Sequence, residues 1–464
     1  MRRVISFLLL LVLVCAMFSG TALAAEPQFT GDVASVYYLL ADADSGRVLA
    51  SSGNDTEHLE PASTTKVMTL LLALEKGNMN DEVTISAHAS GMGGSSCHLK
   101  QGAKIKMQNL LTAMMMVSGN DAATAVAEHI GGGNEQTFID MMNAKAKELG
   151  MNDTNFVTPH GMHKDDHYTT LNDMKILVSA AMKNSAFMDI VDRPSYTLPE
   201  NNSKYDNTNF LLKQDGDYRY PYANGMKTGS TDQAGACLVA SASHDNMNLI
   251  CLLFKDTSAD GKERWPDAKD LFDYGFNTFS TVRLSDVMKD TEPVQKQVEN
   301  CSTTDEKGGL LEFAPPSEDA SVTLSKAAAA GLLDGTDSVE IVPTFVTGDT
   351  LQAPIQKDQV LGSVAYKSKN TGETLYTGQL IATRDVLQAG TESNVNGDTA
   401  VTKLPPMIPE KISENNGHSG IWLWLLVPAG LIGFLVFRLL TQNRKRRKRF
   451  APRRKPQYSY KIRR

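Results

Sequence analysis

The chain has 464 residues, 41% of them hydrophobic, and it carries 46 Lys and Arg residues against 53 Asp and Glu. This length is sufficient for two or three domains with separate hydrophobic cores. The cations are concentrated at the two ends: without residues 1–3 and 438–464 the net charge is about −22, which excludes a generally basic, nucleic-acid-binding surface on the body.

Residues 1–24 have the pattern of a secretory signal peptide. Two arginines precede an apolar run at 4–18, and Ala22-Leu23-Ala24 provides a small-residue cleavage site. The sequence therefore predicts a mature protein that lies outside the cytoplasm.

The first predicted elements of the body are a pair of strands, Val33–Asp42 and Arg47–Ser51, joined by a turn. An apolar segment without Gly or Pro then predicts a mostly buried helix from Ser63 to Lys76, ended by Gly77.

Ser63 and Lys66 are three residues apart at the start of this helix, so they share one face. A serine hydroxyl next to a lysine that loses its proton can act as a nucleophile with its base. Ser63 is also in the position of an ordinary N-cap residue, and the spacing alone is weak evidence for catalysis.

A second apolar helix is predicted at Gln108–Val117, and another begins at Asp121. Between them lies Ser118-Gly119-Asn120. Such a turn can point polar side chains into a cleft, although these residues are also common turn formers.

Two further sequence patterns resemble functional sites, but we interpret both as structural features. Glu148 resembles the acid of a β-lactamase deacylating loop, but it lies in the last turn of a helix that Gly150 ends, where a solvated acid is expected. His160, His163 and His167 lie in a polar loop without the helical i, i+4 spacing typical of metal ligands, so we expect no metal there.

Lys227-Thr228-Gly229 precedes two apolar runs, 236–242 and 248–254, that predict a hairpin. The motif would then lie on an edge strand, where backbone groups are open to an extended peptide and Gly229 allows close approach. Lys227 and Thr228 could hold a carboxylate; the alternative is a simple turn before a strand. Cys237 and Cys251 lie in these runs and are more typical of packed thiols than of a bridge.

From about residue 290 to 390 the composition shifts to short β-like runs, such as Ser338–Phe345 and Val360–Tyr366, without a candidate nucleophile. Residues 391–420 have the composition of a linker.

A second apolar segment, at 421–440, contains 17 residues without a charge and is just long enough to span a bilayer. Residues 441–464 hold 12 Lys or Arg and no acid, which is the pattern of a cytoplasmic tail after a membrane helix. The sequence predicts a single span with an extracytoplasmic body; we regard a nucleic-acid-binding role for the tail as the lesser alternative.

The serine-lysine pair, the Ser-Gly-Asn turn and the Lys-Thr-Gly strand follow one another in the order of the penicillin-recognising acyl-transfer enzymes. The chain resembles the low-molecular-mass penicillin-binding proteins that are serine-type D-alanyl-D-alanine carboxypeptidases. The likeness covers about residues 30–390. Its most specific segments are PASTTKVMT at 61–69, SGNDAA at 118–123, TPHGM at 158–162 and KTGST at 227–231.

The resemblance implies an α+β fold, with a penicillin-binding or β-lactamase-like transpeptidase domain at 25–285 built from an antiparallel sheet and helices. It also implies a β-rich sandwich domain at 290–390 before the transmembrane helix. Many relatives end in an amphipathic helix on the membrane, so the predicted full span is a departure from the family.

The resemblance also implies the site residues. Ser63 would be the acylated nucleophile, Lys66 its base, and Ser118 would pass the proton to the leaving amine. The substrate would be held by further residues that the family motifs supply: Asn120 at the amide, Lys227, Thr228 and Arg264 at the terminal carboxylate, Gly229 along the strand, and Ser230 through an oxyanion-hole N–H shared with Ser63.

The implied partners are peptidoglycan stem peptides and β-lactam antibiotics as covalent inhibitors, with no cofactor. Two alternatives remain at this point: a β-lactamase, which would need a deacylating acid, and a non-catalytic penicillin-binding sensor.

Overall fold

The computed structural model describes residues 27–289, 291–348 and 350–390. The predicted signal peptide at 1–24, the linker at 391–420, the membrane helix at 421–440 and the tail at 441–464 lie outside the described residues. Within the described ranges, no helix combines the length and the apolar character needed to cross a bilayer.

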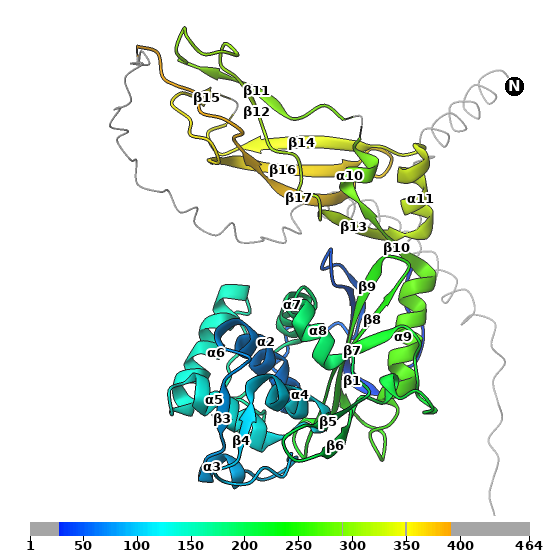
Figure 1. Ribbon diagram of the computed structural model, residues 1–464. Coiled ribbons are helices and arrows are strands. Elements are labelled where there is room, and N and C mark those ends of the chain that lie inside the picture. The colour runs from blue at the N-terminus through cyan, green and yellow to red at the C-terminus, as the bar shows by residue number, and fades with distance from the viewer. Residues whose placement is uncertain (1–26, 290, 349, 391–464) are drawn as a thin grey trace, which may run out of the picture. The chain divides into compact units, whose positions relative to one another are not determined.

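A five-stranded antiparallel sheet is the centre of the first part of the chain (Figure 1). Its strand order is β2-β1-β9-β8-β7. The bounds are β1 Ser35–Asp42, β2 Val48–Ser51, β7 Ala223–Thr231, β8 Gly235–His244 and β9 Met247–Asp256. The predicted strand pair and the predicted hairpin are therefore confirmed, and the Lys-Thr-Gly motif lies on an edge strand.

Helices cover both faces of this sheet because its side chains alternate between two cores. Leu39 and Val239 belong to one core together with the helices that follow β2, whereas Leu40 and Leu238 face a second core beneath α9. The elements between β2 and β7 are η1 Ala62–Thr65, α2 Lys66–Lys76, β3 Glu82–Thr84, α3 Ala87–Ser90, β4 Lys104–Lys106, α4 Met107–Val117, α5 Asn120–Ile130, α6 Glu135–Leu149, α7 Leu171–Met182, α8 Ser185–Val191, β5 Ser195–Leu198, β6 Ser203–Asp206 and η2 Phe210–Leu212; α9 spans Arg264–Thr278.

Ser63 differs from the prediction in its local structure. It lies in η1, a single turn of 3-10 helix, and the α-helix proper begins at Lys66. No side chain caps α2, so Ser63 is not an N-cap. The tighter turn still places residues i and i+3 on one face, because a 3-10 helix has three residues per turn.

The second part of the chain has its own core, formed mainly by strands. Two three-stranded sheets, β14-β16-β17 and β12-β11-β15, and the pair β10-β13 contribute to it. The bounds are β10 Phe279–Arg283, α10 Leu284–Val287, β11 Gln295–Glu299, β12 Leu310–Glu312, β13 Ser321–Ser325, α11 Lys326–Asp334, β14 Val339–Phe345, β15 Leu351–Gln352, β16 Val360–Ser368 and β17 Thr374–Ile381. The β-like runs near 340 and 363 are confirmed, but α11 was not predicted; the domain boundary near 285–290 stays a prediction.

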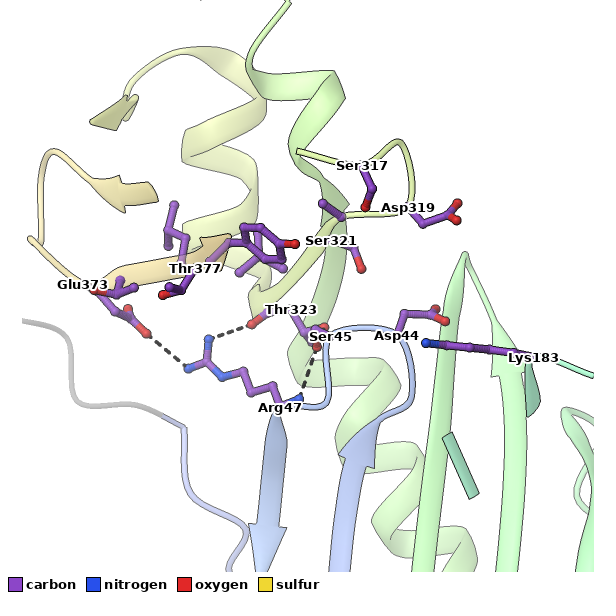
Figure 2. A pocket seen from close by; sticks show the side chains of 15 residues that line it. Asp44, Ser45, Arg47, Lys183, Ser317, Asp319, Ser321, Thr323, Glu373 and Thr377 are labelled. Atoms are coloured by element: carbon purple, nitrogen blue, oxygen red, sulfur yellow. Dashed lines mark hydrogen bonds and ion pairs between the residues drawn. The ribbon is translucent and has the colours of Figure 1, made fainter. Parts of the chain in front are cut away.

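Polar contacts join the β1–β2 turn to strand β13. Ser45 Oγ lies 2.8 Å from Thr323 Oγ1, and Arg47 Nη1 donates a hydrogen bond to the Thr323 carbonyl oxygen. Figure 2 shows the polar pocket of about 660 Å³ beside these contacts, into which Lys183 and Glu373 also extend. The turn of the first sheet is thereby held against the second group of strands.

Candidate active site

Ser63 and Lys66 meet as their spacing predicts. Lys66 Nζ lies 3.1 Å from Ser63 Oγ, and it donates hydrogen bonds of 2.8 Å to Asn120 Oδ1 and to the carbonyl oxygen of His160. Lys66 is completely buried, whereas Ser63 is partly exposed. The lysine amine is thus enclosed by the fold, while the serine side chain remains open to a ligand.

The pKa of Lys66 is held well below its usual value. Burial is the main cause, because it penalises the charged ammonium, and the positive charge of Lys227 lowers the pKa further. A neutral amine has two N–H groups and one lone pair. The two N–H groups match the oxygens of Asn120 and His160, so the lone pair is left to accept the Ser63 hydroxyl proton.

Ser118 occupies the turn between α4 and α5 in a left-handed conformation, with φ of 64°. This conformation ends α4 and lets Asn120 begin α5 directly afterwards. The Ser118 hydroxyl is buried and has no hydrogen-bond partner among the described residues. A buried hydroxyl without a partner is costly, and it is available to a group that enters the site.

Both polar atoms of the Asn120 side-chain amide form hydrogen bonds. Its Oδ1 accepts from Lys66, and its Nδ2 donates to the carbonyl oxygen of Gly93 at 2.8 Å. The next residue, Asp121, accepts hydrogen bonds from the backbone N–H groups of Cys97 and Leu99. Its buried carboxylate therefore holds the loop between α3 and β4 against the start of α5.

Strand β7 forms the other wall. Lys227 is buried and donates to the Thr228 carbonyl oxygen at 3.0 Å, and Thr228 Oγ1 bonds to Thr208 Oγ1 at 2.7 Å. Burial lowers the pKa of Lys227 to about 7, and the charge of Arg264 contributes to the shift. The positive charge of Arg264 thus disfavours the charged form of Lys227.

Gly229 allows β7 to approach Ser63 closely. A Cβ added at Gly229 would lie 3.1 Å from the Ala62 Cβ and 3.2 Å from the backbone nitrogen of Ser63. Any larger residue would push η1 away from the strand. Ser230, the next residue, is exposed at the same edge.

Arg264 is the first residue of α9 and is only partly exposed. Its Nη1 lies 3.4 Å from the carbonyl oxygen of Cys237, its guanidinium stacks over Trp265, and its Nε has no hydrogen-bond partner among the described residues. Its positive charge contributes to the lowered pKa of Lys227. The structure therefore brings all the predicted site residues to one region, with Arg264 at its periphery.

The histidine loop has a structural role. The carbonyl oxygen of His160 receives a hydrogen bond from Lys66, while His167 Nδ1 accepts from the Val157 N–H and its Nε2 lies 2.9 Å from Thr65 Oγ1. Burial lowers the pKa of His160 to about 3 and that of His167 to about 4, so both rings are neutral at physiological pH. The loop thereby supports the turn that carries Ser63.

Glu148 forms an exposed ion pair at the end of α6, with Lys145 Nζ 2.9 Å from its carboxylate. This is the solvated position expected from Gly150, whose φ is 88°. Cys237 and Cys251 are buried free thiols in the described part of the chain.

Three supporting contacts were not identified from the sequence. They are the carbonyl oxygens of Gly93 and His160, which receive the Asn120 and Lys66 hydrogen bonds, and the hydroxyl of Thr208 beneath Thr228. Every residue has a backbone carbonyl, so the residue type does not reveal which carbonyl will accept such a bond. Only the position of His160 within the TPHGM segment hinted at a role.

Comparison with known proteins places the chain among related sequences and folds. The family model described as D-alanyl-D-alanine carboxypeptidase matches residues 21–258. D-alanyl-D-alanine carboxypeptidase DacF of Bacillus subtilis is 33% identical over 84% of this chain and 96% of its own length. DacC of Escherichia coli is 30% identical over 81% of this chain and 90% of its own. The crystal structure of penicillin binding protein 5 from Haemophilus influenzae superimposes with a TM-score of 0.65 and 28% identity, covering 78% of this chain and all of that one.

Proposed function

Since this chain belongs to the D-alanyl-D-alanine carboxypeptidase family, we propose that Ser63 is its acylated nucleophile and Lys66 the general base. The protein is a serine-type D-alanyl-D-alanine carboxypeptidase. The observation that carries the residue assignment is the 3.1 Å contact between the buried Lys66 Nζ and the accessible Ser63 Oγ, on a lysine whose pKa is depressed.

In the first half of the reaction, Lys66 takes the Ser63 proton as Oγ attacks the carbonyl carbon of the penultimate D-alanine. The negative charge that develops on the carbonyl oxygen would be stabilised by the backbone N–H groups of Ser63 and Ser230. The close approach of β7 at Gly229 supports this pairing of donors. When the tetrahedral intermediate collapses, the C–N bond breaks and an acyl-enzyme forms.

The leaving D-alanine needs a proton on its amine. Ser118 would relay it from the Lys66 ammonium; in support, its buried hydroxyl has no competing partner among the described residues. Asn120 would orient Lys66 and hold the substrate amide. Water then attacks the ester, with Lys66 accepting its proton, and the shortened peptide leaves.

The terminal carboxylate would bind Lys227, Thr228 and, more remotely, Arg264. Thr228 can donate to a carboxylate if the Thr208 hydroxyl turns to donate to Thr228, which a freely rotating hydroxyl permits. Peptidoglycan stem peptides carry this terminus, and β-lactams would acylate Ser63 because they mimic it. The name of the H. influenzae penicillin binding protein is in keeping with that expectation.

The test is release of free D-alanine from a peptide that ends in D-Ala-D-Ala, with wild type and Ser63→Ala. Turnover should fall by on the order of 10⁶ in the variant, as for other serine nucleophiles. Activity near wild type would remove Ser63 from the mechanism. A folded protein that binds penicillin covalently but releases no D-alanine would instead favour the sensor alternative, and rapid hydrolysis of the penicilloyl ester would favour a β-lactamase.

We also infer membrane attachment through residues 421–440, with the body outside and the basic tail at 441–464 in the cytoplasm. Support comes from the uncharged segment and the cluster of cations that follows it. Membrane fractions of cells that express the full chain should contain the protein, and truncation after Asn415 should release it. Retention of the truncated chain would contradict the assignment.

A further inference from the structure

The polar pocket of Figure 2 lies between the β1–β2 turn and the second group of strands. Its volume of about 660 Å³ is within the range of small-molecule binding pockets. The first part of the chain lines it with this turn and with Lys183 after α7, and the second part with segments 317–323 and 373–377. Both parts of the chain are therefore needed to form it.

The register of the first sheet separates this pocket from the proposed active site. Asp42, next to the lining turn, is level with Leu249 on β9 and, through β8, with Ala223 on β7. Lys227 lies four residues farther along β7 and three strands away from β1. This separation is about 20 Å, at about 3.4 Å per residue and about 4.8 Å per strand. A ligand in the pocket would leave the active site open.

Hydroxyl groups are the commonest polar groups of the lining. Seven of the fifteen lining residues are Ser, Thr or Tyr. Thr323 is fully buried, and its Oγ1 lies 2.8 Å from Ser45 Oγ and 3.0 Å from Thr281 Oγ1. Ser45 and Thr281 in turn donate to the two oxygens of the buried Asp42. This wall is thus fixed before a ligand arrives, which lowers the ordering cost of binding.

Ser321 supplies a hydroxyl that the fold leaves unused. The residue is 8% exposed and lines the pocket, and its Oγ has no hydrogen-bond partner among the described residues. Figure 2 shows its side chain extending into the space bounded by Asp319 and Asp44. A buried hydroxyl without a partner costs free energy, because its bonds to water are lost on folding. A hydroxyl of a bound ligand would supply the missing hydrogen bond.

The charges of the lining nearly cancel. The acids are Asp44, Asp319 and Glu373. The cations are Lys183 and Arg47, and Arg47 Nη2 lies 3.6 Å from Glu373 Oε1. A strongly charged ligand would meet charges of its own sign here. Carboxylates can instead accept several hydroxyl protons from an uncharged polyol, since each has two acceptor oxygens.

One aromatic ring borders the pocket. Tyr376 is partly exposed, and its ring packs against that of Tyr366 at a centroid distance of 5.9 Å. Leu375 and Val322 add apolar surface to the lining. A sugar ring combines hydroxyl groups at its edge with apolar C–H faces, and an amino sugar adds an acetyl methyl group. Such a ligand matches a lining that offers hydroxyls, carboxylates and an aromatic face together.

We propose that this pocket binds a short run of uncharged sugar residues, and that its occupant is the glycan strand of the cell wall. The choice of this glycan rests on the proposed function, because the stem peptides are attached to it. Since the pocket lies about 20 Å from Lys227, the glycan would be held independently of the peptide at Ser63. The pocket would thus keep the enzyme on its polymeric substrate between turnovers.

The test measures binding of two uncharged tetrasaccharides to the full chain in lipid nanodiscs, which avoid sugar-headed detergents. The probes are tetramers of β-1,4-linked N-acetylglucosamine and of β-1,4-linked glucose. Wild type should bind the N-acetylglucosamine probe more tightly, with a Kd on the order of 1 mM or lower. Salt should not change this Kd, because the ligand carries no charge. No saturable binding of either probe would overturn the proposal, and tighter binding of the glucose probe would overturn the assignment to the wall glycan.

Ser321→Ala should weaken binding of the N-acetylglucosamine probe about two- to tenfold, the range expected for one hydrogen bond. Stability should stay the same or rise, because the change removes a buried hydroxyl without a partner. Ser35→Ala is the matched control. Ser35 Oγ is also buried without a partner among the described residues, but Ser35 does not line the pocket. This control should affect stability in the same way and leave binding unchanged.

Asp319→Ala removes an exposed acceptor from the lining and should weaken binding about five- to tenfold. Glu318→Ala is its control, because this neighbouring acid is also exposed but does not line the pocket. Equal losses in the two variants would trace the effect to net charge and contradict the acceptor role. Wild-type binding by both Ser321→Ala and Asp319→Ala would mean that the sugar binds elsewhere, and would overturn the inference.

The outcomes separate this inference from the proposed function. D-Alanine release from a soluble D-Ala-D-Ala peptide should be the same in wild type, Ser321→Ala and Asp319→Ala, since the pocket is remote from Ser63. Intact release without sugar binding would overturn this inference alone. Sugar binding without D-alanine release would overturn the proposed function, and with it the assignment of the occupant to the wall glycan.

Discussion

Lys66 Nζ and Asn120 Oδ1 lie 2.8 Å apart, and both side chains are buried. The pair joins the first residue of α2 to the first residue of α5. Because Asn120 is neutral, it orients Lys66 without stabilising a positive charge as strongly as a carboxylate would. Asn120 lacks a negative charge that would stabilise the Lys66 ammonium, and the positive charge of Lys227 lowers the pKa of Lys66. Both residues therefore favour the uncharged amine.

Replacing Asn120 by Asp should protonate the base. A carboxylate at this position would raise the pKa of Lys66, and the proposed mechanism requires the neutral amine. At pH 7 we expect kcat/KM for D-alanine release to fall by about 10²- to 10³-fold, within the usual range for general-base catalysis. The acid limb of the pH profile should move to higher pH, so part of the activity returns in alkaline buffer.

Asn120→Ala is the control for this shift, since it removes both amide hydrogen bonds without adding a charge. It should lose activity while its acid limb does not move upward. Identical pH profiles for the two variants would contradict the electrostatic explanation.

Lys227 should take up a proton when a carboxylate ligand binds. The pKa of Lys227 is about 7 in the free protein, and a bound carboxylate would raise it. Uptake should approach one proton per peptide at pH 8 and vanish below about pH 6, where Lys227 is already charged. Affinity should therefore weaken as the pH rises above 7. Calorimetry of an uncleaved D-Ala-D-Ala peptide with Ser63→Ala, in buffers of different ionisation enthalpy, measures this uptake.

The same calorimetry with Lys227→Gln in the Ser63→Ala background should show weaker binding and no buffer-dependent heat. If the double variant takes up protons as the single variant does, another group is responsible and the role of Lys227 must be revised.

Arg384 should stabilise the second core without affecting the reaction. Its Nη1 and Nη2 lie 2.7 Å and 3.0 Å from the two oxygens of Asp305, and Nη2 also donates to the Leu310 carbonyl oxygen. The Asp305 side chain is 5% exposed. Arg384→Ala removes the cation from this carboxylate, which keeps its hydrogen bonds from the Lys307 and Gly309 N–H groups, and should cost about 2 kcal/mol of unfolding free energy. Hydrogen exchange of β11 and β12 can detect the change locally.

The pH dependence of this contribution has a defined sign. The hydrogen bonds from Arg384 lower the pKa of Asp305 to about 2, so the stabilisation is present above its unfolded pKa of 3.8 and is lost as the pH falls through 2. Lys289→Ala is the matched control, because Lys289 and Asp286 form an exposed pair at 3.8 Å that should contribute less than about 1 kcal/mol. Penicillin acylation should be unchanged in both variants.

Local sequence patterns were sufficient to predict several helices, strands and turns around the site. The apolar run after Ser63 specifies a buried helix, and Gly150 ends α6 with the positive φ that glycine favours. The hairpin after Gly229 could be located because both of its strands are short apolar runs around a turn. Spacing of three residues was sufficient to place Ser63 and Lys66 on one face, even though the turn is a 3-10 helix.

Tertiary structure decided the environment of the proposed catalytic residues. Lys66 is bonded to a backbone oxygen 94 residues away, and the depression of its pKa depends on burial and on a lysine from another element. Such contacts follow no periodic pattern in the sequence. They also do not depend on the residue type, since any residue can offer a backbone carbonyl, so they cannot be predicted from the sequence. The sequence by itself determined which groups could react; packing between distant segments decided which of them are charged, because desolvation exists only in the folded chain.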